Sequence, residues 1–581
     1  MSQDTPSVAI FSPWQVVAKA KQGAVYSKIP SQWRIDDIPD ANEMRDASKY
    51  PRTLMSPRAH EITETIDAYT LLSKIATGEY SAVEVTEAFC HRAAIAHQVV
   101  NALSEIMFEE ALSRARELDE YYATYKKTAG PLHGLPVSLK DSFRVRGTNA
   151  AIGLVGLVDE LDTPDTESFV VKELRELGAI IYVKTTVPMG VHHIDTSNNV
   201  TGITYSPRNR LMSAGGSSGG EGALISMHGS IVGIGTDIGA SSRLPAAFNG
   251  IYGLKPSQGR FPYMGTRDMV IGNDAAPFVV GPMGTTVANL KLMAESLLHR
   301  RPWLHDPKVI ELPWRSSEYD DTFARGERGG LVLGMLMFDG VIMPHPPVLR
   351  AIKELKEKLE AAGHEVCSCS NCDCVVIDWT PLPHAEATEI MMTFLQADGR
   401  NTIHSILARA GEPPVKATVD VIGTKPGNPV SVLDLWNANT KRYTYQTKYA
   451  HFWNNTNKVT KSGQVVDAVI FPTYPGASFR PGNGLYFGYT MPTNLLDYSS
   501  VVIPVSQVDK LKDHRAINHT PVNDLDKLIQ SHYDPEEFDG SPIGLQIMGR
   551  RLQEEKVLAL AAVIDRLASN PLISPAKNSN L

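Results

Sequence analysis

The sequence has no long apolar run, few cysteines and no excess of positive charge. It holds 5 cysteines in 581 residues and carries 64 acidic against 56 basic side chains, a net charge of −8. A membrane-spanning helix needs about 20 mostly apolar residues in a row, and no such run is present. The negative charge argues against nucleic acid or an anionic membrane surface as a partner. The first residues include Asp4 and lack the apolar core of a secretory signal. We therefore expect a soluble cytoplasmic protein.

Four of the five cysteines crowd into residues 367–374, "CSCSNCDC". Thiolates this close could share a zinc ion, but a second group of ligands is missing, and one eight-residue segment rarely surrounds a tetrahedral metal. We interpret the segment as reduced thiols on a surface loop or a strand edge and expect no metal. Cys90 falls on the apolar face of a helical pattern and is expected in the core.

The chain begins with 60 proline-rich residues that we expect to form an irregular or helical wrap over the rest. Helical patterns follow at residues 64–77, 81–100 and 105–127. The second of these opens with Ser81 and Glu84, the spacing of a capping box.

Further along, short apolar runs alternate with helical patterns. A helix at 165–177 is ended by Gly178 and followed by the β-branched run at 179–187, and another helix is expected at 347–362. Strands are expected in the same way at 135–143, 230–238, 330–338 and 465–473. Helix, glycine and buried strand in this order predict one large α/β unit with strands covered on both faces.

Two serine-rich segments stand out, "GGSSGGEGA" at 215–223 and "GTDIGASSRLPA" at 235–246. Glycine–serine clusters are most often flexible turns. A nucleophile elbow would nominate Ser218, but it requires a buried strand directly before it, and the preceding segment is polar. An S-x-x-K match at 574–577 lies in a polar tail, and no phosphate-binding lysine follows either glycine-rich segment.

A lysine offers another way to activate a serine. Lys140 ends the apolar segment "PLHGLPVSLKDSF", and burial there would lower its pKa and make it a neutral base. From this segment alone, an ordinary ion pair between Lys140 and its neighbour Asp141 is the stronger interpretation.

In this order the three segments resemble the amidase signature family. That family carries a strand ending in lysine, then G-G-S-S-G-G, then G-T-D-x-G-G-S-[IV]-R-x-P, with two key serines 24 residues apart, as Ser217 and Ser241 are here. Blocks such as "FNGIYGLKPSQGR" and "YDPEEFDGSPIGLQIMGRR" extend the resemblance over nearly all of the chain, towards the fungal acetamidases. The resemblance implies a single α/β domain at 61–581, with a mixed, mostly parallel sheet of about eleven strands between helices.

The resemblance also implies an activity and its residues. Ser241 would attack an amide carbonyl, Ser217, after a cis peptide bond, would relay the proton, and Lys140 would be the base. An acyl-enzyme would then be hydrolysed, releasing acid and ammonia or amine. Small aliphatic or aryl amides are favoured as substrates, with carbamates and esters as further options. Neither a cofactor nor a metal is implied.

Other residues match the family pattern around this set. Backbone N–H groups of Ile238, Gly239, Ala240 and Ser241 would form the oxyanion hole. Val191 stands where the family lines the acyl site, and Asp237 and Arg243 are expected to brace the loop. His133, His192 and His193 are expected in the core or the pocket wall, because no acidic partner completes a metal-ligand set.

Three positions depart from the family pattern. Ala240 replaces a glycine, Ser242 replaces an isoleucine or valine, and Met189 stands where glutamine or glutamate is more usual. Because none is one of the three key residues, they bear on substrate preference.

Two other functions stay open at this point. One is the amidase subunit of a tRNA-dependent amidotransferase, which the flanking blocks and the absence of a basic surface oppose. The other is a catalytically silent binding protein, which the intact lysine and serines oppose. A homodimer is left open as the oligomeric state.

Overall fold

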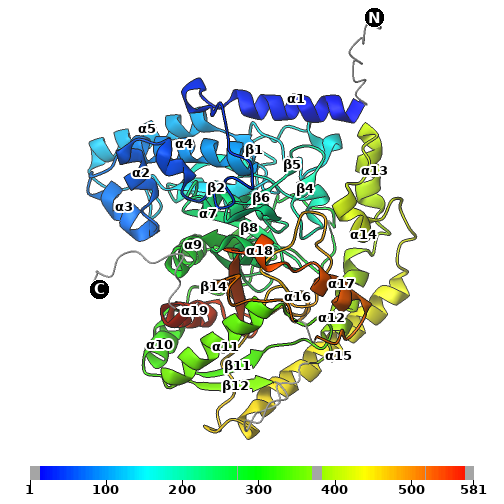
Figure 1. Cartoon of the computed structure of the whole chain (residues 1–581). Helices are drawn as coiled ribbons and strands as arrows, with labels where there is room; N and C mark the ends of the chain where they lie inside the picture. The colour runs from blue at the N-terminus through cyan, green and yellow to red at the C-terminus, as the bar shows by residue number, and fades with distance from the viewer. Residues whose placement is uncertain (1–12, 271, 370–381, 517–518, 569–581) are drawn as a thin grey trace, which may run out of the picture.

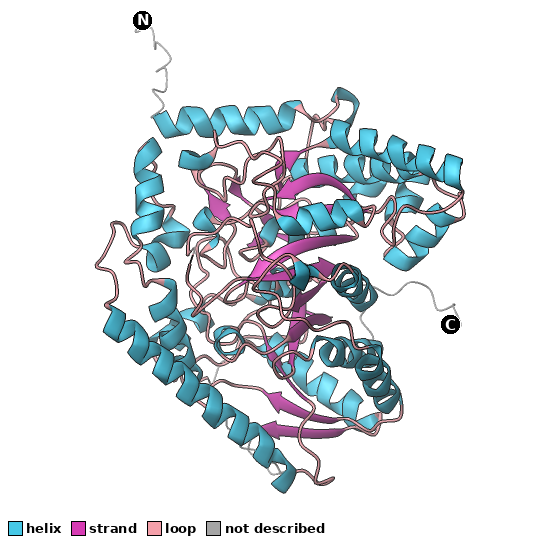
Figure 2. Ribbon diagram, turned by 180° about the vertical axis from the view of Figure 1, so that it is seen from behind, coloured by secondary structure: helices cyan, strands magenta, loops and turns pink. Residues whose placement is uncertain are grey.

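An eleven-stranded sheet runs through the protein from end to end (Figure 2), in a computed structural model that describes residues 13–270, 272–369, 382–516 and 519–568. The order across the sheet is β1 (Leu103–Ile106), β3 (Ile180–Thr185), β2 (Pro136–Lys140), β8 (Val232–Asp237), β10 (Val279–Gly284), β9 (Tyr252–Lys255), β14 (Ser500–Gln507), β15 (Pro542–Met548), β13 (Ala468–Pro472), β11 (Val332–Leu336) and β12 (Glu365–Cys369).

The sheet is mixed, as expected, but parallel pairing does not predominate. Parallel pairs join β2 to β3 and β8, and β11 to β12 and β13. The six other pairings between neighbouring strands are antiparallel. The expectation of a mostly parallel sheet is therefore corrected. Strands buried on both faces read as continuous apolar runs, and such a run does not show which way its neighbour points.

Helices cover both faces of the sheet (Figure 1). They are α1 (Pro13–Ser27), α2 (Pro57–Thr63), α3 (Ala68–Ala76), α4 (Ala82–Val100), α5 (Phe108–Tyr125), α6 (Phe169–Glu176), α7 (Gly219–Ser226), α8 (Arg243–Asn249), α9 (Val287–His299), α10 (Ser316–Glu327), α11 (Pro346–Ala361), α12 (His384–Leu395), α13 (Asn401–Ala410), α14 (Val419–Ile422), α15 (Val432–Asn454), α16 (Met491–Leu495), α17 (Asp524–Ser531), α18 (Pro535–Phe538) and α19 (Glu554–Ala568).

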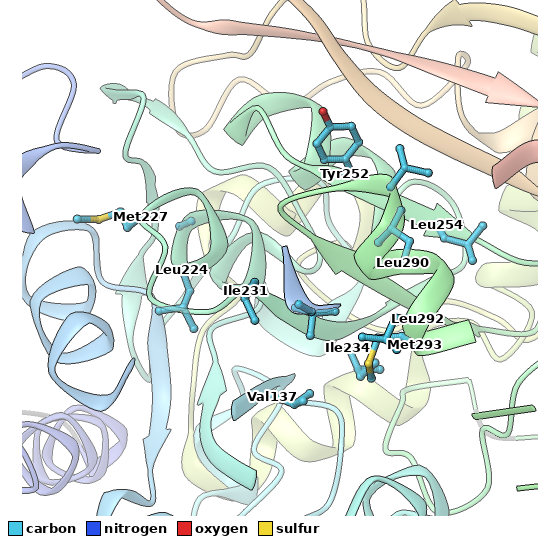
Figure 3. Close-up of a cluster of buried hydrophobic side chains, with 14 of the residues drawn as sticks. Val137, Leu224, Met227, Ile231, Ile234, Tyr252, Leu254, Leu290, Leu292 and Met293 are labelled. Carbon is cyan, nitrogen blue, oxygen red and sulfur yellow. The ribbon is translucent and has the colours of Figure 1, made fainter. Parts of the chain in front are cut away.

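Alternating side chains of the central strands build two separate cores. On β14, Val501 and Ile503 join the cluster that includes α19, whereas Val502 joins the cluster around α8. Figure 3 shows part of the first cluster, where Val137 of β2 and Ile234 of β8 lie near side chains of α9. Because both faces of each central strand are dry, the strands hold their ends, and the loops that follow them, in fixed positions.

The capping box and the glycine identified in the sequence lie at the ends of two observed helices. Ser81 accepts a hydrogen bond from the backbone N–H of Glu84 at the start of α4, and Gly178, with φ of 91°, follows the end of α6. The helix expected at 64–77 begins only at Ala68, because Asp67 caps the start of α3, and the preceding helix α2 has already ended at Thr63. The pattern at 105–127 contains the end of β1 before α5 begins.

The N-terminal segment contains a helix, α1, that lies along the outside of the sheet at β1 (Figure 1). Lys21 forms an ion pair with Glu105 of β1, and Gln22 Nε2 donates to the carbonyl oxygen of Val200 over 2.8 Å. The boundary drawn after residue 60 falls inside α2, so no loop separates the two segments there.

The cysteines occupy two different environments. Cys90 is fully buried in α4, as expected. Cys367 and Cys369 belong to β12 at the edge of the sheet, whereas residues 370–381, with the other two cysteines, lie outside the described residues, as does the S-x-x-K match at 574–577. Among the helices that the structure describes, none has the length and apolar character needed to cross a membrane.

Candidate active site

Three segments far apart in the sequence meet at one point beside the central strands. Lys140 ends β2, Ser217 lies just before α7, and Ser241 lies between β8 and α8. The Nζ atom of Lys140 is 2.7 Å from Ser217 Oγ and 2.8 Å from Thr236 Oγ1. Lys140 and Ser217 are fully buried, and Ser241 is 5% exposed. The structure thus brings together the three residues that the motif nominates.

Lys140 is held in a state suited to a base. Burial lowers its pKa to about 7, against the opposing effect of Asp237 and Glu221. The simpler interpretation, an ion pair with Asp141, is wrong. Asp141 instead lies 3.2 Å from Lys184 Nζ and accepts hydrogen bonds from Ser104 Oγ and the backbone of Ile152.

The two serine-bearing loops are joined through their backbones. The peptide bond between Gly216 and Ser217 is cis. The next N–H, that of Ser218, donates to the carbonyl oxygen of Ser241 over 3.0 Å. The side chain of Ser218, the elbow candidate, is fully buried, and its Oγ lies 3.4 Å from the carbonyl oxygen of Thr236.

Two glycines of the site have close neighbours, which are backbone atoms in only one case. A Cβ on Gly216 would lie 2.6 Å from the carbonyl oxygen of His193, and a Cβ on Gly239 would lie 3.0 Å from Met491 Cε. A side chain at Gly216 would displace the loop of Ser217 from the backbone of His193, whereas at Gly239 it would meet only the flexible end of Met491.

A buried ion pair braces the loop that carries Ser241. Arg243 contacts Asp237 through two nitrogens, each 3.1 Å from a carboxylate oxygen, and both residues are fully buried. Although burial opposes its ionisation, the guanidinium of Arg243 lowers the pKa of Asp237 to about 2. The carboxylate also accepts from the backbone N–H of Ser242 over 3.1 Å. The bracing role expected of this pair is therefore observed.

A cavity of about 40 Å³ opens at Ser241. All residues expected at the oxyanion hole and the acyl site line it, namely Val191, Ile238, Gly239, Ala240 and Ser241. A water molecule occupies roughly 10–15 Å³ by this kind of measure, so the cavity has room for about three waters or one very small molecule.

Much of the cavity wall comes from a part of the chain that the sequence did not single out. Between Leu395 and Ile422, the ends of α12, α13 and α14 contribute a wall made of Leu395, Gln396, Asp398, Arg400, Ile403, Val421 and Ile422. These residues follow no motif, and only the packing of the helices places them opposite Ser241.

The histidines near the motifs are wall and core residues, as expected. His192 and His193 line the cavity, and burial lowers the pKa of each to about 4, so both are neutral at physiological pH. His133 is buried elsewhere, and its Nδ1 accepts from the backbone N–H of Ala129 over 3.0 Å. Within the described ranges, no group of three or more histidine, cysteine or acidic side chains could hold a metal ion.

Two departures from the family pattern have clear local partners. The hydroxyl of Ser242 lies 3.2 Å from Asp237 Oδ2 and 3.3 Å from the carbonyl oxygen of Leu254. It therefore contacts the ion pair of Asp237 and does not line the cavity. Met189 is fully buried, and its sulfur lies 3.8 Å from Thr418 Oγ1.

Fold and site together define the class of protein. The chain belongs to the amidase family, whose model, described as "Amidase", matches residues 84–558, and it is an amidase that hydrolyses carbon–nitrogen amide bonds. The chain is 40% identical to an acetamidase of Emericella nidulans over 96% of this chain and 98% of that one. Identity to an acetamidase of Aspergillus oryzae is 39%, over 95% and 98%. Among solved structures, a fatty acid amide hydrolase superposes with a TM-score of 0.88 at 30% identity, covering 96% of each chain.

Proposed function

We propose that the protein hydrolyses short carboxylic amides through an acyl-enzyme, with Ser241 as nucleophile, Ser217 as proton relay and Lys140 as base. The observation that carries this proposal is the buried Lys140, whose Nζ lies 2.7 Å from Ser217 Oγ. Its pKa near 7 leaves a large neutral fraction at physiological pH, so the amine can accept a proton.

The reaction proceeds in two balanced steps. Ser241 Oγ attacks the amide carbon while its proton passes to Ser217, whose own proton passes to Lys140. The tetrahedral intermediate collapses when Ser217 returns a proton to the leaving nitrogen and regains one from Lys140, so ammonia or an amine departs and an ester remains on Ser241. Water then attacks that ester by the same route and releases the acid.

The turn at 238–241 supplies the electrostatic contribution. Backbone N–H groups of Ile238, Gly239, Ala240 and Ser241 are proposed to face the oxygen that becomes negative, an effect worth about 3 kcal/mol per donor in comparable sites. The ion pair between Asp237 and Arg243 fixes this turn before substrate binds, so no reorganisation is needed during the reaction.

The cavity size supports a short acyl group. The small space beside Ser241 favours a short acyl group. The relatives named acetamidases at about 40% identity support the same substrate class. Acetamide-like amides are therefore proposed as preferred substrates, with aryl amides, carbamates and esters of short acids as further ones.

The test measures ammonia or amine release from acetamide, butyramide, hexanamide and acetanilide by the wild type and by Ser241→Ala. Hydroxylamine is added as a second nucleophile, because an acyl-enzyme transfers its acyl group to form a hydroxamate. We expect turnover to be greatest with acetamide, a hydroxamate product, and loss of both in Ser241→Ala. Undiminished turnover in that variant would overturn the mechanism, and activity that appears only with a glutamyl-tRNA partner would favour an amidotransferase subunit.

A further inference from the structure

Glu221 is a fully buried carboxyl group that the proposed mechanism does not use. It lies in the first turn of α7, four residues after Ser217. Its Oε1 is 2.9 Å from Thr185 Oγ1 on β3, and its Oε2 is 2.6 Å from Ser138 Oγ on β2. Lys140 is two residues further along β2, and Glu221 and Lys140 influence each other electrostatically. The carboxyl group of Glu221 therefore lies against the same strands that position Lys140, the proposed base.

The chain makes room for this carboxyl group with a glycine. A Cβ on Gly233 of β8 would lie 2.0 Å from Glu221 Oε2 and 2.3 Å from Ser138 Oγ. Any other residue at this position would displace the contact between the acid and the serine. The contact is thus enclosed by β2, β3, β8 and α7, with no space for a side chain between them.

A chain of hydroxyl groups leads away from Glu221. Ser138 Oγ, which contacts Oε2, lies 2.9 Å from Ser230 Oγ, and Ser230 Oγ lies 2.9 Å from the carbonyl oxygen of Val232. That carbonyl can only accept a hydrogen bond. In the hydrogen bond between Ser230 Oγ and the carbonyl oxygen of Val232, Ser230 is therefore the donor.

The number of protons available to this chain then indicates whether Glu221 is protonated. Three oxygen–oxygen contacts join Glu221 to Ser138, Ser138 to Ser230 and Ser230 to Val232, and Ser230 also interacts with Tyr182. When each of the three contacts holds a hydrogen bond, three protons are needed, and the two serine hydroxyls supply two. The nearby Tyr182 hydroxyl donates to the carbonyl oxygen of Gly229 and so has no proton to give. The third proton belongs to the carboxyl group, and Thr185 donates to its other oxygen.

We propose that Glu221 is a positioning residue, held protonated by the chain Ser138–Ser230–Val232, so that it adds no second negative charge to that of Asp237 beside Lys140. The protonated state follows from the hydroxyl chain alone, whereas its effect on Lys140 rests on the proposed function. Ionised Glu221 would stabilise the ammonium form of Lys140, and an ammonium group cannot take the proton of Ser217.

The ionisable groups around Glu221 agree with this assignment. They are Lys140 on β2 and Tyr182 on β3, and Asp237 at the end of β8 acts on the same lysine. Burial raises the pKa of Glu221, against the opposing effects of Ser138, Thr185 and Lys140, so burial favours the protonated acid and the hydroxyl chain is proposed to add to this effect.

The sharpest variant is Ser230→Ala, which removes the acceptor of the Ser138 hydroxyl. Ser138 then turns its proton towards Glu221, the acid ionises, and Lys140 becomes more basic. We expect the acidic limb of the kcat/KM profile to move to higher pH by about 0.5–1 unit. Ser226→Ala is the matched control, because it removes another buried hydroxyl of this region, bonded only to the carbonyl oxygen of Asn249, and should leave the limb in place. An unmoved limb in Ser230→Ala overturns the proposal.

A second variant, Glu221→Gln, tests the neutral state directly. The amide can donate to Ser138 and accept from Thr185 as the protonated acid does, so kcat/KM should stay within about threefold and the acidic limb within about 0.3 unit. If Glu221 were ionised in the working enzyme, its removal would shift the limb down by about one unit or more.

Infrared difference spectroscopy provides a readout that needs no activity. A carboxylic-acid C=O band present in the wild type near neutral pH should be missing from Glu221→Gln and lost in Ser230→Ala. Asp565→Asn is the control, because Asp565 is a carboxyl group with pKa raised by burial to about 6 on the distant α19. Absence of a Glu221 band overturns the proposal. Persistence of that band together with an active Ser241→Ala variant would overturn only the mechanism.

Discussion

The backbone N–H of Ser218 donates to the carbonyl oxygen of Ser241 over 3.0 Å, which ties the loop before α7 to the loop before α8. Because of this bond, the backbone sets the position of Ser217 relative to Ser241, and no contact between their side chains is needed for it. The loop of Ser241 follows β8, which is buried on both faces, whereas the loop of Ser217 follows β7 (Asn209–Ser213) of a separate two-stranded sheet and leads into α7. Because α7 packs on β2 and β8, the bond joins two loops that rest on the same part of the large sheet.

Replacement of the two adjacent serines separates their roles. In Ser217→Ala, kcat for acetamide should fall by about 10²–10⁴, because the proton relay to Lys140 is removed. Ser218→Ala should lose less than about threefold, because its side chain makes one weak contact to a carbonyl oxygen. Steady-state kinetics at pH 8 distinguish the two. Equal losses in both variants would contradict the assignment of Ser217.

The charge of Lys140 links activity and stability to pH. Activity should rise with pH through about 7, because only the neutral amine acts as base. The folded-state pKa is below the unfolded value of 10.5, so the unfolded chain binds more protons between pH 7 and 10.5, and the free energy of unfolding should rise over this window by up to roughly 5 kcal/mol.

In Lys140→Met, the free energy of unfolding should therefore no longer rise with pH because of this lysine. The same variant should lower kcat by about 10²–10⁴. Lys255→Met is a matched control, because Lys255 is also fully buried, with its pKa lowered by burial to about 8, and it donates only to backbone carbonyls. It should reduce the stability slope above pH 8 without moving the acidic limb of activity. A Lys140→Met variant with an intact acidic limb would show that another group is the base.

The sequence predicted which three residues would meet at the candidate site better than it predicted their surroundings. Lys140, Ser217 and Ser241 were found because a long motif contains them, and within that motif Gly216 allows the backbone of His193 to approach closely. The partner of Lys140 was not found from its own segment, where Asp141 looked more suitable. Asp141 directly follows Lys140 in the sequence, but its carboxylate contacts Ser104 of β1 and Lys184 of β3.

Strand direction and the cavity wall were beyond local patterns. A strand such as β14 is apolar on both faces, so its sequence is the same whether its neighbours run parallel or antiparallel. The wall residues between Leu395 and Ile422 lie on short helices whose placement depends on contacts with remote loops, such as Ile403 against Gly190. No spacing in the sequence encodes these contacts.

The ion pair that braces the loop of Ser241 should be costly to break. Arg243→Met leaves Asp237 charged and buried, and should lower the free energy of unfolding by about 3–5 kcal/mol. Arg243→Lys should recover less than half of this loss, because an ammonium cannot reproduce the two parallel contacts.

Urea unfolding compares these variants with Arg551→Met, which removes a half-exposed ion pair with Asp497 and should cost at most about 1 kcal/mol. A loss in Arg243→Met no greater than in Arg551→Met would show that the pair does not brace the loop.

The methyl group of Ala240 should restrict the acyl group that the cavity accepts. Ala240 lines the cavity at the turn proposed as the oxyanion hole, where the family usually has glycine. Removing one methyl group in a tight pocket changes discrimination by about tenfold, so Ala240→Gly should raise the kcat/KM ratio of butyramide to acetamide by roughly that factor. Ala247→Gly on α8, a buried alanine of the same core that does not line the cavity, is the control and should leave the ratio unchanged. An unchanged ratio in Ala240→Gly would mean that the methyl group does not meet the acyl chain, and that the walls from α13 and α14 set the length limit instead.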